Sequence, residues 1–175
     1  PFGDTDKYCG GNNIAIGKMP LYSNENGTSN IAIGVATLYE NDSGESNIAI
    51  GSQSLKSNVA GHSNVAIGKH AMSDNILGSD NVAIGRQAMG DNKQAIDAVY
   101  NAGIGGPRFT RNIAVGANSM WRHGGVNNVA VGVDALAGVS LMPSKGSDNV
   151  ALGWAAGFNN EGSRNVYIGA KAGDG

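Results

Sequence analysis

The chain is poor in cysteine, charge and aromatic side chains. Of its 175 residues one is cysteine, 15% are charged and 6% are aromatic. The single cysteine, Cys9, cannot form a disulfide within the chain; we interpret it as a free thiol, with a link to another chain as the alternative. The net charge of −2 predicts no attraction to nucleic acid or anionic membranes. No apolar run reaches membrane-spanning length, so we expect no membrane insertion.

Sequence patterns for catalysis or metal binding are also missing. There is no phosphate-binding loop and no Cys/His spacing for zinc, and the scattered serines do not indicate a Ser-His-Asp triad. We therefore predict no catalytic residue, no metal and no cofactor. The three histidines are interpreted as surface residues: His62, His70 and His123. Five acidic turn residues are interpreted as solvated, with a carboxylate pair or a calcium site as the alternative: Glu25, Asp42, Glu45, Asp74 and Asp91.

What the chain has in abundance is one five-residue motif, Asn-(Ile/Val)-(Ala/Tyr)-(Ile/Val/Leu)-Gly, which occurs nine times. The first five copies are 17 residues apart, and the later steps are 31, 16, 21 and 16 residues. A fixed period of this size predicts one structural unit that is stacked many times. The copies begin at Asn13, Asn30, Asn47, Asn64, Asn81, Asn112, Asn128, Asn149 and Asn165.

Within each copy, apolar residues alternate with alanine, which is the period of a β-strand. In the second copy, Ile31 and Ile33 are expected to fill a core while Ala32 faces the opposite side. Because alanine is a poor strand former, a column of eight alanines in register predicts close approach of a second backbone, as in an oligomer. A large apolar residue, Leu or Met, recurs four positions after most of the glycines that follow the strands, and glycines recur at both ends of the unit.

These features predict an all-β fold, a parallel β-roll or β-solenoid of about nine coils of 16–17 residues. Each coil is expected to contain a strand, a turn, a short second strand and a polar turn. Stacked asparagine side chains are expected to hydrogen-bond as a ladder. The polar turns vary freely, so changes at Glu40, Asn41 or Asp42 should be nearly silent for folding.

The predicted organisation is a lead-in segment (1–11) followed by a repeat domain (12–175) with an insertion at about 91–111. The sequence Asn-Ala-Gly-Ile-Gly at 101–105 could be a degenerate tenth copy, but its spacing favours an insertion loop. In the last two coils Gly157 and Gly173 replace the large apolar residue, which suggests tapering or continuation into another domain.

The repeat resembles those of bacteriophage tail fibres. The resemblance is carried by residues 47–55 (NIAIGSQSL) with the following Gly61, and by residues 149–157 (NVALGWAAG). The Asn-Val-Ala-Ile-Gly core is also similar to the head repeats of trimeric autotransporter adhesins. Those heads are left-handed parallel β-rolls with three chains per trimer, so the resemblance implies a left-handed homotrimer. Their repeat is usually shorter, and the 17-residue period favours the phage family.

The resemblance implies a non-enzymatic segment of a tail fibre, located in the virion, that attaches to a host-cell surface glycan or outer-membrane receptor. The head domain of a bacterial cell-surface adhesin is the first alternative. A polysaccharide depolymerase is the second. Fold alone does not decide among these.

The period break offers the best candidate for ligand binding, because a regular roll repeats the same small side chains at every level. Aromatic faces can stack on sugar rings, and Arg or His can hydrogen-bond hydroxyl or acidic groups. The alternative is that Phe109 and Trp121 fill the space that the insertion leaves. The candidate residues are Tyr100, Arg108, Phe109, Trp121, Arg122 and His123.

Overall fold

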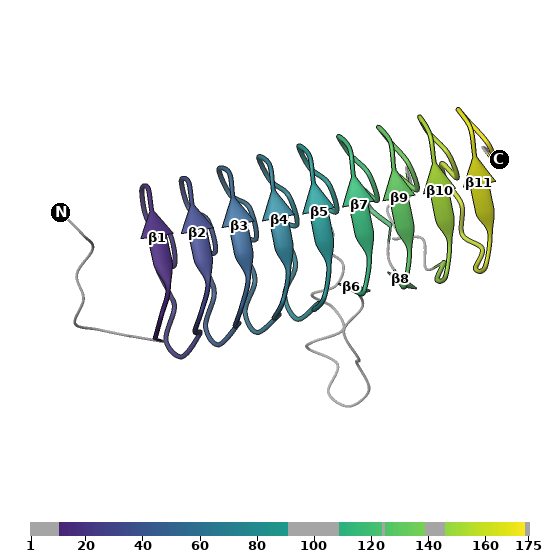
Figure 1. Cartoon of the computed structure of the whole chain (residues 1–175). Coiled ribbons are helices and arrows are strands. Elements are labelled where there is room, and N and C mark those ends of the chain that lie inside the picture. The colour runs from purple at the N-terminus through teal and green to yellow at the C-terminus, as the bar shows by residue number, and fades with distance from the viewer. Residues whose placement is uncertain (1–10, 91–108, 124, 139–145, 174–175) are drawn as a thin grey trace.

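The protein is a parallel β-solenoid in which each coil contributes one short strand to the main sheet (Figure 1). The computed structural model describes residues 11–90, 109–123, 125–138 and 146–173. Nine strands form one sheet in the order β1-β2-β3-β4-β5-β7-β9-β10-β11, and β6 and β8 form a separate pair. The strands are β1 (Ile14–Ile16), β2 (Ile31–Ile33), β3 (Ile48–Ile50), β4 (Val65–Ile67), β5 (Val82–Ile84), β6 (Phe109–Thr110), β7 (Ile113–Val115), β8 (Gly125–Val126), β9 (Val129–Val131), β10 (Val150–Leu152) and β11 (Val166–Ile168).

The register of the sheet places equivalent residues of neighbouring repeats directly beside one another. Ala32 pairs with Ala49, and the same parallel register runs from β1 to β11. Strand β5 pairs directly with β7, with Val82 beside Ile113. No other strand of the sheet therefore lies between β5 and β7. The sequence 101–105 itself lies outside the described residues.

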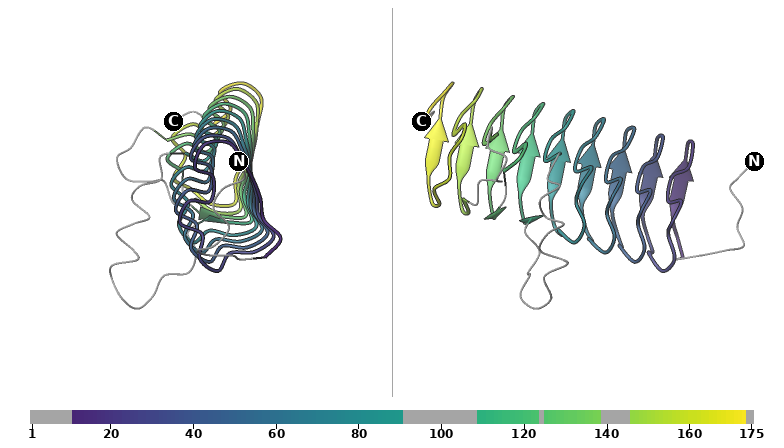
Figure 2. Two further views of the ribbon diagram at one scale, coloured as in Figure 1. Left: turned by 90° about the vertical axis from the view of Figure 1, so that its left-hand side faces the viewer. Right: turned by 180° about the vertical axis from the view of Figure 1, so that it is seen from behind.

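The coil is left-handed. We call the part of each coil that follows the strand-end glycine the return segment. In Figure 1 the strands run upward on the near face and the return segments run down behind them, while the chain advances from left to right. The view along the axis shows the coils stacked one behind another (Figure 2). Three positions per regular coil hold non-glycine residues at positive φ, such as Ala36, Leu38 and Ser46 in the second coil. These left-handed residues turn the chain at the corners of the coil.

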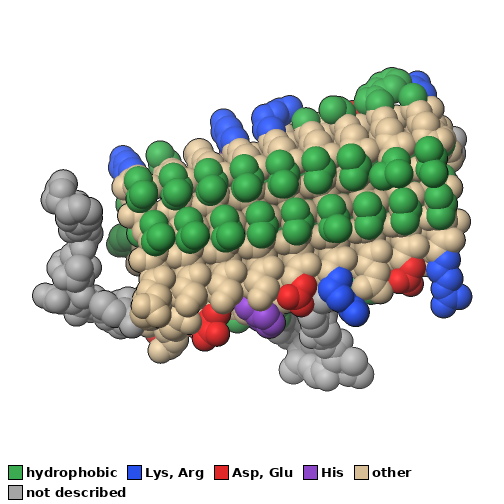
Figure 3. Space-filling view, viewed as in Figure 1, with side chains coloured by type: hydrophobic (Ala, Val, Ile, Leu, Met, Phe, Trp, Pro, Cys, Tyr) green, Lys and Arg blue, Asp and Glu red, His purple; other side chains and the backbone are tan. Residues whose placement is uncertain are grey.

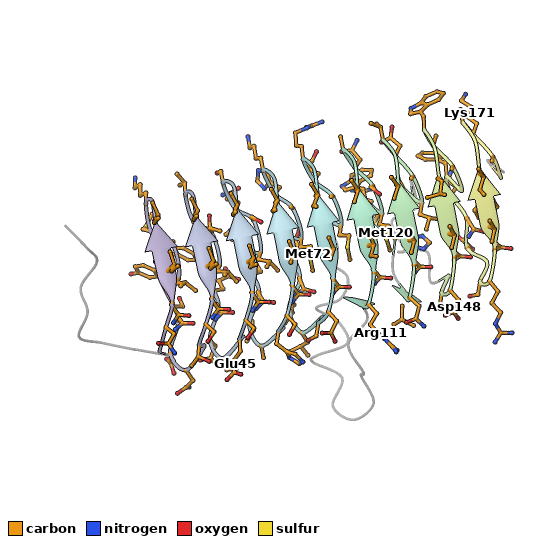
Figure 4. All side chains as sticks on the ribbon, in the orientation of Figure 1. Glu45, Met72, Arg111, Met120, Asp148 and Lys171 are labelled. Atoms are coloured by element: carbon orange, nitrogen blue, oxygen red, sulfur yellow. The ribbon has the colours of Figure 1, made fainter. Side chains whose placement is uncertain are left out.

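The inner and outer faces of the strands are the reverse of the sequence-based prediction. The alanines point inward and are fully buried, as Ala32 and Ala66 illustrate at 0% exposure, whereas the isoleucines and valines point outward. The alanines pack against the large apolar residues of the return segment, and Figure 4 shows Met72 and Met120 behind the strands. Because the return segment lies so close, the strand has room for no more than a methyl group inside. The large buried residues are Leu38, Leu55, Met72, Met89, Met120 and Leu136.

Glycine at the end of each strand of the nine-stranded sheet except the last, β11, is required by close approach between coils. Gly51 has φ +125°, and a Cβ added there would lie 2.7 Å from the carbonyl carbon of Gly68 in the next coil. Side chains are therefore excluded at this corner on two grounds, backbone conformation and space.

The predicted asparagine ladder is confirmed. The backbone N–H of each motif asparagine donates to the Oδ1 of the preceding one, at 2.9 Å from Asn47 to Asn30 and 3.0 Å from Asn64 to Asn47. The Nδ2 of Asn47 also donates to the carbonyl of Gly61 at 2.8 Å. Across the insertion the ladder continues, since the N–H of Asn112 donates to Oδ1 of Asn81 at 3.1 Å. Every buried amide in this column therefore serves the stacking of coils.

A second asparagine ladder lies in the turns, where the sequence suggested free variation. The Nδ2 of Asn41 donates to Oδ1 of Asn24 at 2.7 Å, and that of Asn58 donates to Oδ1 of Asn41 at 2.8 Å. Asn75 continues the series by donating to Asn58 at 2.8 Å. Asn41 is fully buried, so the prediction that its substitution is silent is wrong. Its neighbours Glu40 and Asp42 are partly or fully exposed, as the prediction requires.

In the last coils the large core residue comes from the strand and not from the return segment. Tyr167 replaces the inward alanine, and Gly157 and Gly173 replace the Leu or Met of the return segment. A Cβ on Gly157 would lie 2.7 Å from the Tyr167 ring. The Tyr167 hydroxyl donates to Oδ1 of Asn160 at 2.9 Å. The ring thus fills the space that the two glycines leave, and the coil does not taper there.

Candidate functional site

The turn after β7 carries three of the six candidate ligand-binding residues. The guanidinium carbon of Arg122 lies 4.4 Å from the centroid of the Trp121 ring, in a cation–π contact. Arg122 has φ +55°, so this corner of the coil presents it in a left-handed backbone conformation. The Trp121 Nε1 is buried and has no hydrogen-bond partner within the described ranges. Because Arg122 covers one face of the indole, a sugar could stack only on the other face.

His123 is buried, not a surface residue as the sequence suggested. Its side chain is 1% exposed. Burial lowers the pKa of the imidazole to about 4, because the loss of solvation outweighs a hydrogen bond to the backbone of Gly146 that raises the pKa. The ring is therefore neutral at neutral pH and supports the turn from within. Its burial leaves it no open surface with which to contact a ligand.

The end of the insertion lies beside the same turn. Strand β6 pairs in parallel with β8, with Phe109 beside Gly125, which is two residues after His123. This pairing puts the end of the insertion one strand spacing from the residues that follow the Trp121 turn. Tyr100 and Arg108 lie outside the described residues, as does the side chain of Phe109. Of the six candidates, the structure therefore brings together the side chains of Trp121 and Arg122.

The most extensive surface feature was missed by the sequence analysis because those residues were assigned to the core. Two parallel rows of outward apolar side chains run the length of the sheet (Figure 3). They comprise the first and third residue of each three-residue strand of the nine-stranded sheet, 18 side chains in all. Ile50, Ile84 and Val131 are 36%, 38% and 40% exposed. We call this surface the apolar face.

Charged residues border the apolar face on both sides. We call the residues that directly precede the motif asparagines the lower edge, and those that directly follow the strand-end glycines the upper edge. The lower edge includes Arg111 and Asp148, and Lys171 lies beside the upper edge (Figure 4). Backbone hydrogen bonds connect successive coils at both edges. At the lower edge the N–H of Asp80 donates to His62 O at 3.1 Å, and at the upper edge the N–H of Gln87 donates to Lys69 O at 3.0 Å.

One serine and one histidine lie close enough to suggest nucleophilic catalysis, but their contacts indicate a structural role. The Oγ of Ser79 lies 3.0 Å from Nδ1 of His62 and accepts the N–H of His62 at 3.1 Å. The same link recurs where Ser147 accepts the N–H of Val126 at 3.1 Å. Because the serine hydroxyl links successive coils at both places, we interpret it as a structural contact between coils.

The described residues contain no group of three or more His, Cys, Asp or Glu side chains that could hold a metal ion. Within the same ranges no helix is long and apolar enough to cross a membrane. Comparison of the chain with protein-family models, curated proteins and solved structures found no significant match. The function must therefore be argued from the surface of the rod.

Proposed function

We propose that the chain is a non-enzymatic segment of a bacteriophage tail fibre, part of the virion, that assembles as a homotrimer and attaches to the host-cell surface. The observation that carries the proposal is the apolar face, a continuous water-exposed strip along a regular rod. The resemblance of the repeats to tail-fibre repeats supplies the class of protein and the number of chains.

The apolar face is too large for an isolated chain. Nine of its 18 side chains are 36–69% exposed, so the strip amounts to roughly 1,000 Å², above the ~300–600 Å² of the largest patch on a typical monomer. It also reaches the ~800 Å² that each partner buries in a standard interface. Three rods arranged around a common axis enclose their apolar faces and leave the turns outside.

Sedimentation tests the assembly directly. We expect a trimer for the native chain, and loss of the trimer when Ile50 and Ile84 are both changed to Asp, because the carboxylates would be buried between chains. The matched control is Leu77→Asp, which alters a side chain that is 39% exposed in a turn away from the apolar face. A native chain that stays a folded monomer would refute the proposal.

Receptor contact is proposed at the turn of Trp121 and Arg122 together with the insertion, where the regular surface is interrupted. The ligand proposed there is a cell-surface glycan or an outer-membrane receptor. The test replaces Tyr100, Arg108 and Arg122 with Ala and measures adsorption to host cells or to purified polysaccharide. The control is Arg164→Ala, an exposed arginine in the last coil. Adsorption that falls in the triple variant but not in the control supports the site, provided that both trimers melt alike.

The head of a trimeric bacterial adhesin remains the second candidate, because a roll with an apolar face fits both kinds of fibre. The neighbouring coding sequence distinguishes them: tail-assembly or chaperone domains belong to a phage, and an outer-membrane anchor belongs to an adhesin. We expect no release of reducing sugars from the polysaccharide in the adsorption assay. Release would instead support the depolymerase alternative.

A further inference from the structure

We infer that Arg86 and Asp80 form an ion pair between neighbouring chains that sets the register of the assembly. The inference rests on the proposed trimer and deepens it, since it identifies side chains that would align the rods along their common axis. Both residues are exposed, and both belong to the coil of β5, the fifth of nine strands in the sheet. Asp80 lies on the lower edge and Arg86 on the upper edge.

The two residues do not pair within one chain, because the width of the sheet separates them. Strand β5 (Val82–Ile84) lies between Asp80 and Arg86. Rotation about an axis parallel to the rods, with the apolar faces turned inward, brings the upper edge of one chain against the lower edge of the next. In that arrangement Arg86 of one chain meets Asp80 of its neighbour at the same level.

Only the unstaggered parallel arrangement gives this attraction. The upper edge carries cations at Lys18, Lys69 and Arg86 in the first five coils and no acid, while the lower edge carries Asp80. With no stagger, Arg86 faces Asp80 and the small Ala117 faces Arg111. A slip of one coil in one direction places Lys69 against Asp80 but also places Arg86 against Arg111, and a slip in the other direction places Arg86 against Ser63.

An antiparallel pairing of rods is opposed by the same residues. In that arrangement upper edge meets upper edge and lower edge meets lower edge. Because the coil of β5 is the central one of nine, Arg86 would then face Arg86 of the other chain, and Asp80 would face Asp80. Like charges at matched positions oppose association, and contacts of this kind commonly set partner choice more than total affinity.

The test compares Arg86→Glu, Asp80→Arg and the double variant with the native chain. Each single change puts like charges at all three contacts of a trimer, and the double change restores opposite charges. We expect each single variant to raise the protein concentration needed for half-assembly roughly tenfold at low salt. The double variant should recover the native value, and about 1 M salt should remove the differences.

Lys69→Glu is the matched control, because it reverses a cation of the same edge one coil away. In the unstaggered trimer Lys69 faces Ser63, so its reversal should have little effect. If Lys69→Glu weakens assembly while Arg86→Glu does not, the rods are staggered by one coil and the inference is wrong. If a trimer forms and none of the charge changes alters it, the pair is absent. A native chain that does not trimerise refutes the underlying proposal instead.

Mixing provides a second measurement that is independent of absolute stability. When R86E and D80R chains of different mass are refolded together, mixed trimers replace repulsive contacts with attractive ones. Random assembly gives about three-quarters mixed trimers for two equivalent chains. Native mass spectrometry should show a clear excess over that fraction, and the random fraction would count against the ion pair.

Discussion

Replacing Asn58 with Ala should destabilise the protein far more than its place in a turn suggests. The side chain makes three buried hydrogen bonds: its Nδ2 donates to Asn41 Oδ1 at 2.8 Å and to Gly61 O at 2.9 Å, and its Oδ1 accepts from Asn75 at 2.8 Å. At about 1 kcal/mol net for each bond, the loss is about 3 kcal/mol. Asn41 Oδ1 is also left buried without its donor, which adds about 1 kcal/mol.

The expected loss of unfolding free energy is therefore about 4 kcal/mol. Denaturant unfolding at a fixed protein concentration measures it, since the proposed assembly would make apparent stability depend on concentration. The control is Ser57→Ala, a neighbouring turn residue whose backbone N–H donates to Ser73 O at 2.9 Å and is retained in the variant. A loss below about 1 kcal/mol, equal to that of Ser57→Ala, would refute the assignment of the second ladder as a source of stability.

Three further predictions concern the core and His123. Ala66→Leu should destabilise the coil by about 1–3 kcal/mol or more in denaturant unfolding, because Ala66 is fully buried; a neutral result would show that the interior is not close-packed. Tyr167→Ala should lower the melting temperature more than Tyr167→Phe, which keeps the ring that fills the space beside Gly157; equal effects would assign the stability to the hydroxyl. Because the pKa of His123 is lowered to about 4 in the folded chain, the unfolded chain takes up its proton first as pH falls below 6.5. Unfolding free energy should thus fall by up to about 3 kcal/mol between pH 6.5 and 4, and His123→Gln should remove that slope.

The sequence was sufficient to predict the strands and their register because both follow from the period. Residues 17 apart must stack when every coil has the same length, so Ala32 beside Ala49 and Asn47 above Asn30 were predictable. The period also contains a signal for the second ladder. Asn24, Asn41, Asn58 and Asn75 share the 17-residue spacing, but they lie among variable polar residues.

Which strand face is inside could not be decided from alternation alone. A period of two separates Ile48 and Ile50 from Ala49 without stating which side is buried. The answer depends on the width of the coil, which is set by how near the return segment lies to the strand. In the last coil the inward residue is Tyr167, and the return segment opposite has glycine. This pairing of a large residue on one side with a small residue on the other was the available signal for which strand face is buried.

The candidate ligand site was less predictable because burial there depends on contacts between coils. His123 lies two residues after Trp121 in a polar-looking turn, yet it is buried and its pKa is lowered through desolvation. The cation–π contact of Arg122 with Trp121 occurs where Arg122 has a left-handed backbone conformation. Neither property is visible from composition or spacing.

The direction of the hydrogen bonds between coils has a mechanical consequence. These bonds run parallel to the long axis, as from the N–H of Ile31 to the carbonyl of Asn47 at 2.8 Å. A pull between the two ends of one chain therefore opens the bonds of one coil at a time instead of shearing many together. Each released 17-residue coil would lengthen from ~4.8 Å to about 55 Å of extended chain. Under tension such a rod would yield in equal steps of about 50 Å, dissipating load while the remaining coils stay folded.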